Sequence, residues 1–127
     1  MGEKQKKVIF ISGPITGVDK YWEAFEAAED DLDGLGYIPL SPTRLPGGMS
    51  EAAYMRICLA MIDSADAVLF LPGSASSLGA MCELRYCEKT GKPAVELQTH
   101  NPCHWEPLTA AARRARLKHD LEEVLGK

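Results

Sequence analysis

Hydrophobic residues occur along this chain either in short continuous runs or in longer stretches with a helical repeat. The continuous runs cover residues 8–11, 37–40, 67–71 and 94–97. Each is short enough for a β-strand, and the most apolar of them, at 67–71, predicts a central strand buried on both faces. Pro39 places the second run at a sheet edge, because proline cannot donate to a central ladder.

A helical repeat follows the first run. Its apolar positions lie three and four residues apart, which predicts an amphipathic helix. We expect Asp19 to cap this helix and Gly34 or Gly36 to end it. The acids expected on its outer face are Glu23, Glu26, Glu29, Asp30 and Asp33.

Three further helices are predicted between and after the remaining strands. Ser50 is placed to cap the second helix, whose apolar residues extend to Ile62. The third runs over residues 77–89 and stops at Gly91, and the last covers residues 108–125. Residues 98–107 show no repeat and are expected to be irregular.

Strands that alternate with helices predict an α/β fold. We expect residues 1–127 to form one doubly wound, flavodoxin- or Rossmann-like domain. Its mainly parallel sheet would hold four to five strands, with helices on both faces. Ligands bind such sheets beyond the carboxyl ends of the strands, where the strand order reverses. Two turns of small residues, at 12–17 and 72–77, should border that crevice.

Composition removes several classes of partner. The 127 residues carry a net charge of -4, and the pI is near 5.3. An acidic balance disfavours nucleic-acid polymers and anionic membranes. No apolar run approaches the about 18 residues of a membrane span, and the first apolar segment is too short for a signal peptide. We therefore expect a cytoplasmic protein with no membrane partner.

Cysteine and histidine positions do not indicate a metal. The four cysteines lack paired ligand spacing and suit reduced, packed thiols. His100, Cys103 and His104 are three loosely spaced groups in one segment, which is a weak zinc signal. We predict no metal and no cofactor.

The segment from Leu69 to Glu83 carries the clearest functional signal. It reads as a buried strand, a turn of small residues, and a helix with one carboxylate about a turn and a half in. Gly79 lies one turn before Glu83 on nearly the same face, which leaves a gap in front of the carboxylate. Ser76 and Ser77 would rim that gap. A solvated glutamate is the alternative, but the apolar neighbours of Glu83 favour a functional acid.

The turn after the first strand is a second candidate. It lacks the spacing of a Walker loop or a dinucleotide fingerprint, yet its amides and hydroxyls are suited to hold a phosphate or a sugar. A turn that needs glycine only for its dihedral angles is an equally good interpretation. The residues concerned are Ser12, Gly13, Pro14, Ile15, Thr16 and Gly17.

Basic residues gather on the last predicted helix. The simplest interpretation is a solvated face answered by acids of the same helix. These basic residues are Arg113, Arg114, Arg116 and Lys118, and the acids are Asp120, Glu122 and Glu123.

Three segments together resemble the nucleoside 2-deoxyribosyltransferase superfamily, which includes nucleoside 5′-monophosphate N-glycosidases. They are residues 10–17 (FISGPITG), 65–68 (ADAV) and 77–83 (SLGAMCE). The likeness covers residues 8–96, is closest to a small branch often met in phage genomes, and is most specific in its Ser-Leu-Gly-x-x-x-Glu spacing. It implies that Glu83 attacks the anomeric carbon and forms a covalent glycosyl-enzyme.

The resemblance also implies binding roles, and this chain departs from some of them. In the monophosphate hydrolases, the serine that matches Ser77 and the turn at 12–17 hold the 5′-phosphate, so Ser77 points to a nucleotide. The hydrolases often have an arginine in that turn, and this chain has Thr16 at the same position. The family has a tyrosine on the first strand beside the nucleophile, and this chain has Phe10 in its place. The family's aspartate that protonates the leaving base is replaced here by Cys58. Tyr54, one turn earlier, is a candidate to supply the missing hydroxyl.

These observations support an N-glycosidic enzyme that acts on a small nucleoside or nucleotide. The alternative is a nucleotide-binding module of the same fold, impaired by Phe10 and Cys58. The plainest interpretation is an α/β domain whose acid is structural. The resemblance also implies a homodimer or higher homo-oligomer, in which residues 98–107 would complete a neighbour's pocket.

Overall fold

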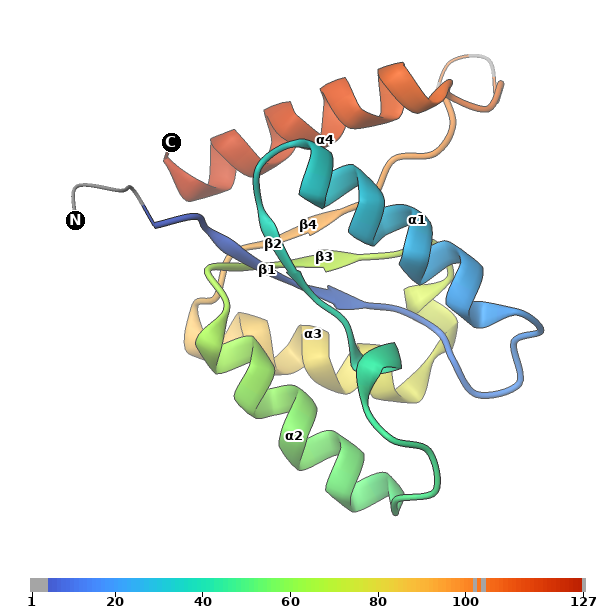
Figure 1. Ribbon diagram of the computed structural model, residues 1–127, viewed down its shortest axis with the longest axis vertical. Coiled ribbons are helices and arrows are strands. Elements are labelled where there is room, and N and C mark those ends of the chain that lie inside the picture. The colour runs from blue at the N-terminus through green and yellow to red at the C-terminus, as the bar shows by residue number, and fades with distance from the viewer. Residues whose placement is uncertain (1–4, 102, 104, 127) are drawn as a thin grey trace.

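A parallel sheet forms the centre of the computed structural model, which describes residues 5–101, 103 and 105–126. Its four strands within those residues lie in the order β2-β1-β3-β4 (Figure 1). The strands are β1 (Val8–Ser12), β2 (Ile38–Leu40), β3 (Ala67–Phe70) and β4 (Ala94–Glu96). The predicted parallel α/β fold is confirmed, as are the edge position of β2 and the internal position of β3.

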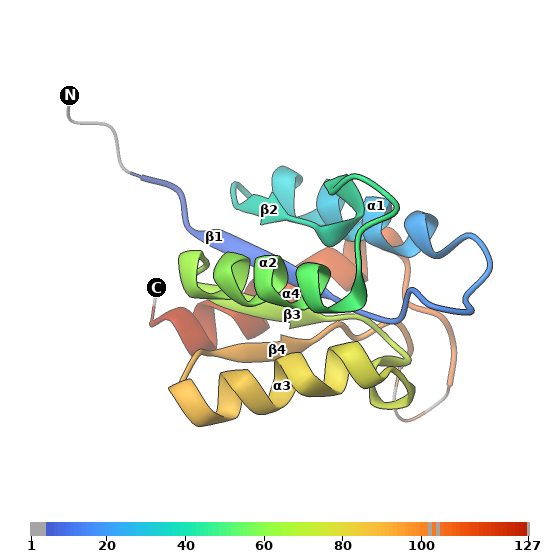
Figure 2. The same cartoon turned by 90° about the horizontal axis from the view of Figure 1, so that it is seen from below.

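Helices cover both faces of this sheet, as the alternating pattern predicts (Figure 2). The helices α1 (Tyr21–Gly34) and α4 (Ala110–Leu125) pack on one face. The opposite face carries α2 (Glu51–Ser64) and α3 (Leu78–Thr90). Within the described ranges, no helix combines the length and the apolar character needed to cross a membrane.

Local signals place most helix ends. Ser50 and Ser77 cap α2 and α3 through their side chains, and Gly91 ends α3 in a left-handed conformation. The expectation for Asp19 is wrong: Lys20 is the N-cap of α1, with φ 53° and no side-chain cap. The chain therefore turns into α1 through the backbone of Lys20, and Asp19 lies one residue outside the cap.

The prediction that the basic residues of α4 form a solvated face is wrong for two of its arginines. Arg113 and Arg114 both bind Asp31 of α1, with their Nε atoms 2.6 and 2.8 Å from its carboxylate oxygens. Asp31 is only 1% exposed. Arg116 does pair with Asp120 of the same helix, as expected. The α4 helix is thus fastened to α1 by charge as well as by apolar packing.

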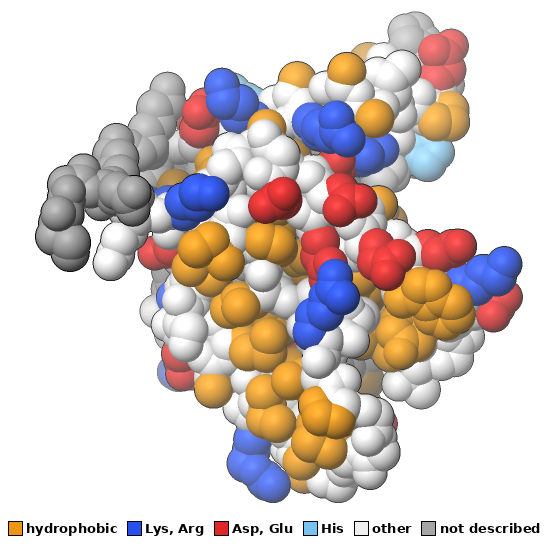
Figure 3. Space-filling view, viewed as in Figure 1, with side chains coloured by type: hydrophobic (Ala, Val, Ile, Leu, Met, Phe, Trp, Pro, Cys, Tyr) orange, Lys and Arg blue, Asp and Glu red, His pale blue; other side chains and the backbone are white. Residues whose placement is uncertain are grey.

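One acid of α1 also departs from its expected outward position. Acidic side chains do gather along α1 at the surface (Figure 3). Glu29, however, is buried, and Arg44 donates to its Oε1 at 2.6 Å. Arg44 ends the short 3-10 turn η1 (Pro42–Arg44), so this ion pair fixes the segment after β2 against α1.

Candidate functional site

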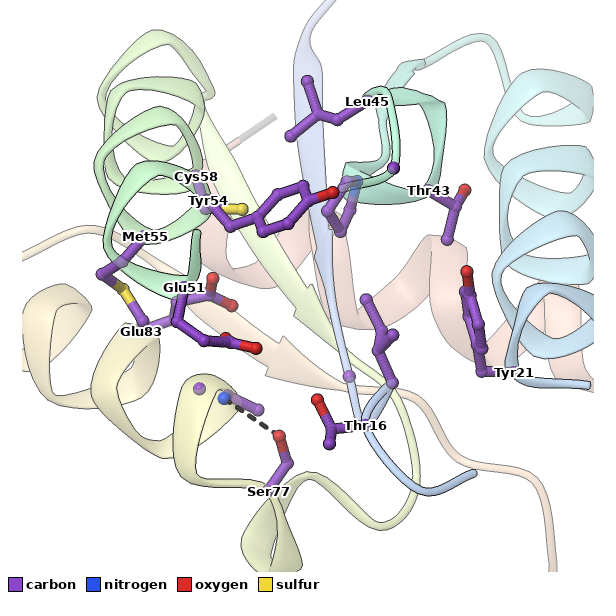
Figure 4. Close-up of a pocket in the computed structure, with 16 residues that line it drawn as sticks. Thr16, Tyr21, Thr43, Leu45, Glu51, Tyr54, Met55, Cys58, Ser77 and Glu83 are labelled. Carbon is purple, nitrogen blue, oxygen red and sulfur yellow. Dashed lines mark hydrogen bonds between the residues drawn. The ribbon is translucent and has the colours of Figure 1, made fainter. Parts of the chain in front are cut away.

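A cavity of about 330 Å³ lies at the carboxyl end of the sheet. Its walls come from the β1–α1 turn, the segment after β2, one face of α2 and the start of α3 (Figure 4). The lining residues are Gly13, Ile15, Thr16, Tyr21, Pro42, Thr43, Leu45, Gly47, Glu51, Tyr54, Met55, Cys58, Ser77, Gly79, Ala80 and Glu83. This is the edge of a parallel sheet at which ligands bind.

Glu83 is the most buried charged group in the wall of this cavity. Its residue exposure is 7%, and the Ser12 hydroxyl donates to its Oε1 at 2.6 Å. Ser12 is the last residue of β1 and is fully buried. The bond joins residues 71 apart in sequence, so it forms only when α3 packs against the end of the sheet.

The surroundings of Glu83 shift its acidity. Burial raises the pKa of Glu83, while the Ser12 hydroxyl and the neighbouring Cys58 thiol partly offset this rise. Burial chiefly raises the pKa of Cys58 to about 12, and the negative charge of Glu83 and the contact with its carboxylate add to the rise. Cys58 is therefore a neutral thiol at pH 7. Its partner is a carboxyl that binds its proton more tightly than an exposed glutamate does.

The turn after β1 contributes only part of its length to the cavity. Gly13, Ile15 and Thr16 line it, whereas Ser12 lies beneath and holds Glu83. A β-carbon at Gly13 would lie 3.0 Å from Cβ of Leu71, so glycine suits the close approach of the two strand ends, and a larger residue would press against Leu71.

The other predicted residues of this strand and turn lie away from the cavity wall. Pro14 packs toward Gly73, where an added β-carbon would lie 3.3 Å from the proline ring. Gly17 has a left-handed conformation with φ +77° and does not line the cavity. Phe10 is fully buried in the apolar cluster between the sheet and the α2–α3 layer. It contributes packing beneath the site and no polar group to it.

The start of α3 opens toward the cavity. Ser77 caps the helix by accepting from Ala80 N at 3.2 Å, and its side chain lies in the cavity wall. A β-carbon added at Gly79 would meet no atom within 4 Å, so there is open space in front of this glycine. Ser76 does not line the cavity.

Tyr54 lies in the wall, but its hydroxyl is directed at the loop before α2. The hydroxyl donates to Pro46 O at 2.6 Å and accepts from Met49 N at 3.3 Å. A phenol has one proton, and this one is already donated to a backbone carbonyl. Tyr54 therefore shapes the loop and is not directed at Glu83.

Several lining residues are absent from the sequence-based candidates. Glu51 and Met55 belong to α2 and fall on the face shared by Tyr54 and Cys58, since positions 51, 54, 55 and 58 are three and four apart. That spacing is a signal the sequence contains. Tyr21, Pro42, Thr43, Leu45 and Gly47 come from turns and helix ends whose approach depends on the fold.

Metal ligands are not assembled in the part of the chain that the structure describes. No three His, Cys, Asp or Glu side chains gather there as a metal site requires. His104, one of the three residues weighed as a zinc cluster, lies outside the described residues.

The sequence and the fold both have recognisable relatives. Residues 7–96 match the model of a family described as a domain of unknown function, DUF4406. There is no significant match among curated proteins. The 2-deoxyribosyltransferase of Bacillus psychrosaccharolyticus is 22% identical, with a TM-score of 0.57 over 70% of each chain.

Two other solved structures have similar folds. The 2-desoxiribosyltransferase from Leishmania mexicana is 22% identical with a TM-score of 0.58, over 74% of this chain and 67% of its own. An ABC sugar transporter subunit from Rhodobacter sphaeroides is 21% identical with a TM-score of 0.51, over 76% of this chain and 33% of its own. The fold of 2-deoxyribosyltransferases is therefore shared, at an identity that leaves the activity to be argued from the site.

Proposed function

The chain belongs to the DUF4406 family, and we propose that it cleaves or transfers at the N-glycosidic bond of a nucleoside or nucleoside 5′-monophosphate. One observation carries this proposal. Glu83 is a buried carboxylate in the wall of a ligand-sized cavity, and its partners are a hydroxyl and a thiol rather than a cation. The shared fold with 2-deoxyribosyltransferases supports this reaction class.

The reaction has two steps. A carboxylate oxygen of Glu83 bonds to the anomeric carbon as the carbon–nitrogen bond breaks, and the electron pair leaves with the base. The base takes a proton from water. In the second step, water or a second base attacks the same carbon, and the bond to Glu83 breaks. The carboxylate is regenerated, and the proton of the attacking group goes to solvent.

Each side chain near Glu83 has a distinct part in this reaction. The Ser12 hydroxyl fixes the carboxylate and stabilises its charged form through a hydrogen bond of 2.6 Å. Cys58, with a pKa of about 12, keeps its proton at neutral pH and contacts the carboxyl without competing as a nucleophile. The open space at Gly79 accommodates the sugar in front of the carboxylate.

Base release tests this proposal. Free base is measured by chromatography from a panel of nucleosides and 5′-monophosphates, with wild type beside Glu83→Gln. Glu88→Gln is the matched control, because Glu88 lies on the same helix, is exposed and pairs with Arg85. We expect release by wild type and Glu88→Gln and none by Glu83→Gln. Release that persists in Glu83→Gln contradicts the proposal.

A nucleotide-binding module of the same fold is the second candidate. It is favoured because neither predicted proton donor suits the leaving base: Cys58, with a pKa of about 12, is a weak acid, and the Tyr54 proton is donated to Pro46 O. General acid catalysis is worth about 10²–10⁴-fold, so its absence would weaken turnover without weakening binding. A nucleotide that raises the melting temperature without any base release would support this module.

Oligomerisation belongs to the same proposal. A homodimer or higher homo-oligomer would bring residues 98–107 of one copy to the pocket of another. Trp105 in this segment is 79% exposed, as an unpaired contact residue would be. Light scattering on the purified protein measures the assembly, and a monomer at all concentrations would contradict it.

A further inference from the structure

The charged side chains in the cavity wall all have the same sign. Glu51 and Glu83 line it, and no lysine, arginine or histidine is among the described lining residues. A ligand inside therefore meets two carboxyl groups and no basic side chain. Such a wall repels an anion and admits a neutral molecule.

Glu51 is the more accessible of the two acids. It is the first residue of α2, follows the capping residue Ser50 and is exposed. The amino end of a helix stabilises a negative side chain. In Figure 4, its carboxylate points from α2 into the cavity, toward the side where Thr16 and Ser77 lie. Its charge thus faces the hydroxyls that would otherwise suit a phosphate.

Arg44, the arginine nearest in sequence to the lining segment after β2, does not balance the charge of the two carboxyl groups. Arg44 directly follows the lining residue Thr43, but its guanidinium is paired with Glu29 at 2.6 Å. The ion pair directs Arg44 toward α1. Arg56 of α2 is exposed and does not line the cavity.

The amino end of α3 at Ser77 attracts an anion, and so does the amino end of α2, where Glu51 lies. A helix end is equivalent to about half a positive charge. Ser77 already uses the Ala80 amide for its cap, which leaves fewer free donors at this end. Half a charge at each of these two helix ends does not outweigh the two carboxyl groups, Glu51 and Glu83, in the same wall.

From this charge pattern we propose that the pocket selects an uncharged nucleoside over the corresponding 5′-monophosphate, with Glu51 as the residue that sets the selection. The inference rests on the proposed function, since it names the substrate class of the same pocket. In the sequence, Ser77 points to a nucleotide substrate. The inference differs, because the carboxylate of Glu51 faces the position where that serine would meet a phosphate.

Paired binding measurements test the selection. Isothermal titration calorimetry in phosphate-free buffer compares each 2′-deoxyribonucleoside with its 5′-monophosphate on wild type, Glu51→Gln and Glu23→Gln. Glu23 is the matched control, because it is an exposed acid in the first turn of another helix and does not line the cavity. Base released in the same samples is measured separately by chromatography.

We expect wild type to bind the nucleoside about tenfold more tightly than its monophosphate, which is about 1.4 kcal/mol. Glu51→Gln should lower the ratio of the two dissociation constants at least about threefold, because it removes one negative charge that repels the phosphate. Only the binding of the monophosphate should become tighter. Glu23→Gln should leave the ratio unchanged. A monophosphate that binds as tightly as the nucleoside, or a ratio insensitive to Glu51→Gln, overturns the inference.

The two proposals fail separately in this experiment. Preferential nucleoside binding without base release contradicts the enzyme and supports the charge selection. Base release with a preference for the monophosphate contradicts the charge selection and supports the enzyme. Absence of binding by every nucleoside and nucleotide contradicts both.

Discussion

Asp31 and Glu83 are both buried carboxyls, but their surroundings differ. Asp31 is 1% exposed and binds Arg113 and Arg114, whereas Glu83 is 7% exposed and binds the Ser12 hydroxyl. Burial tends to raise the pKa of both groups. At Asp31 the two arginines outweigh burial and lower the pKa, while at Glu83 burial prevails and raises it.

This difference is the one we expect between a structural acid and a reactive acid. A carboxylate held by two cations has its charge neutralised and its oxygens occupied, so it fastens α4 to α1. A carboxylate held by neutral donors at a cavity keeps an oxygen available for chemistry, at some cost in stability. On this contrast rests the proposal that Asp31 serves the fold and Glu83 serves the reaction.

The largest expected effect is the loss of activity in Glu83→Gln. Removal of a nucleophile should lower the rate of base release by at least about a thousandfold. The free energy of unfolding at pH 7 should stay the same or rise, because a buried charge is replaced by a neutral amide of the same shape. Chromatography and urea denaturation measure the two quantities. Loss of stability in parallel with activity would assign Glu83 to the fold instead.

Asp31→Asn should show the reverse pattern. Two arginines lose their partner, so we expect a loss of about 3 kcal/mol in the free energy of unfolding. Binding of a nucleoside should survive below the unfolding transition, because Asp31 does not line the cavity. Urea denaturation and calorimetric titration measure these outcomes. A stable Asp31→Asn variant that fails to bind ligand would contradict the division of roles.

Ser12→Ala tests the neutral donor beside Glu83. Loss of a hydrogen bond to a charged group costs about 1.5–3 kcal/mol, and one pKa unit corresponds to about 1.4 kcal/mol. The acidic limb of the pH–rate profile should therefore move upward by about one unit, with activity restored at higher pH. Ser64→Ala is the control, since the Ser64 hydroxyl donates to Ala60 O within its own helix and does not line the cavity. If the acidic limb of the pH–rate profile does not move, Ser12 does not influence the acidity of the catalytic group.

The smallest effect is the pH dependence of stability, and its sign differs between the two acids. The raised pKa of Glu83 means that the folded state binds its proton more tightly, so stability falls as pH rises from the unfolded value of about 4.3 through the folded pKa. The lowered pKa of Asp31 gives stability that is present above its unfolded value and lost as pH falls through the folded pKa.

Denaturation of wild type and Glu83→Gln across this range measures the contribution of Glu83. The stability advantage of Glu83→Gln should be small near about pH 4 and grow toward neutral pH. An advantage that shrinks with rising pH would contradict the assignment. For Asp31→Asn, the free energy of unfolding should fall further below that of wild type as pH rises.

The sequence predicts the parallel α/β fold because its signals are local. The apolar run of β3, Pro39 at the sheet edge and the caps Ser50 and Ser77 each act within a few residues. The place of Glu83 in the cavity wall is predictable for the same reason, since Gly79 and the capping residue Ser77 lie within two turns of it.

Contacts between distant residues account for what the sequence does not reveal. The bond from Ser12 to Glu83 joins residues 71 apart, and the one from Arg113 to Asp31 joins residues 82 apart. No spacing rule links such pairs. The same limit applies to Tyr54, whose place on α2 is predictable but whose hydroxyl is directed away from Glu83 by Pro46.

A covalent intermediate on Glu83 is the most direct consequence of this account. Wild type and Glu83→Gln are incubated with nucleosides that carry a 2′-fluorine, which slows the breakdown of a glycosyl-enzyme, and their peptides are analysed by mass spectrometry. The account predicts a glycosyl adduct on the peptide that contains Glu83 in wild type and none in the variant. Base release accompanied by an adduct on a different residue, or by no adduct, would contradict it.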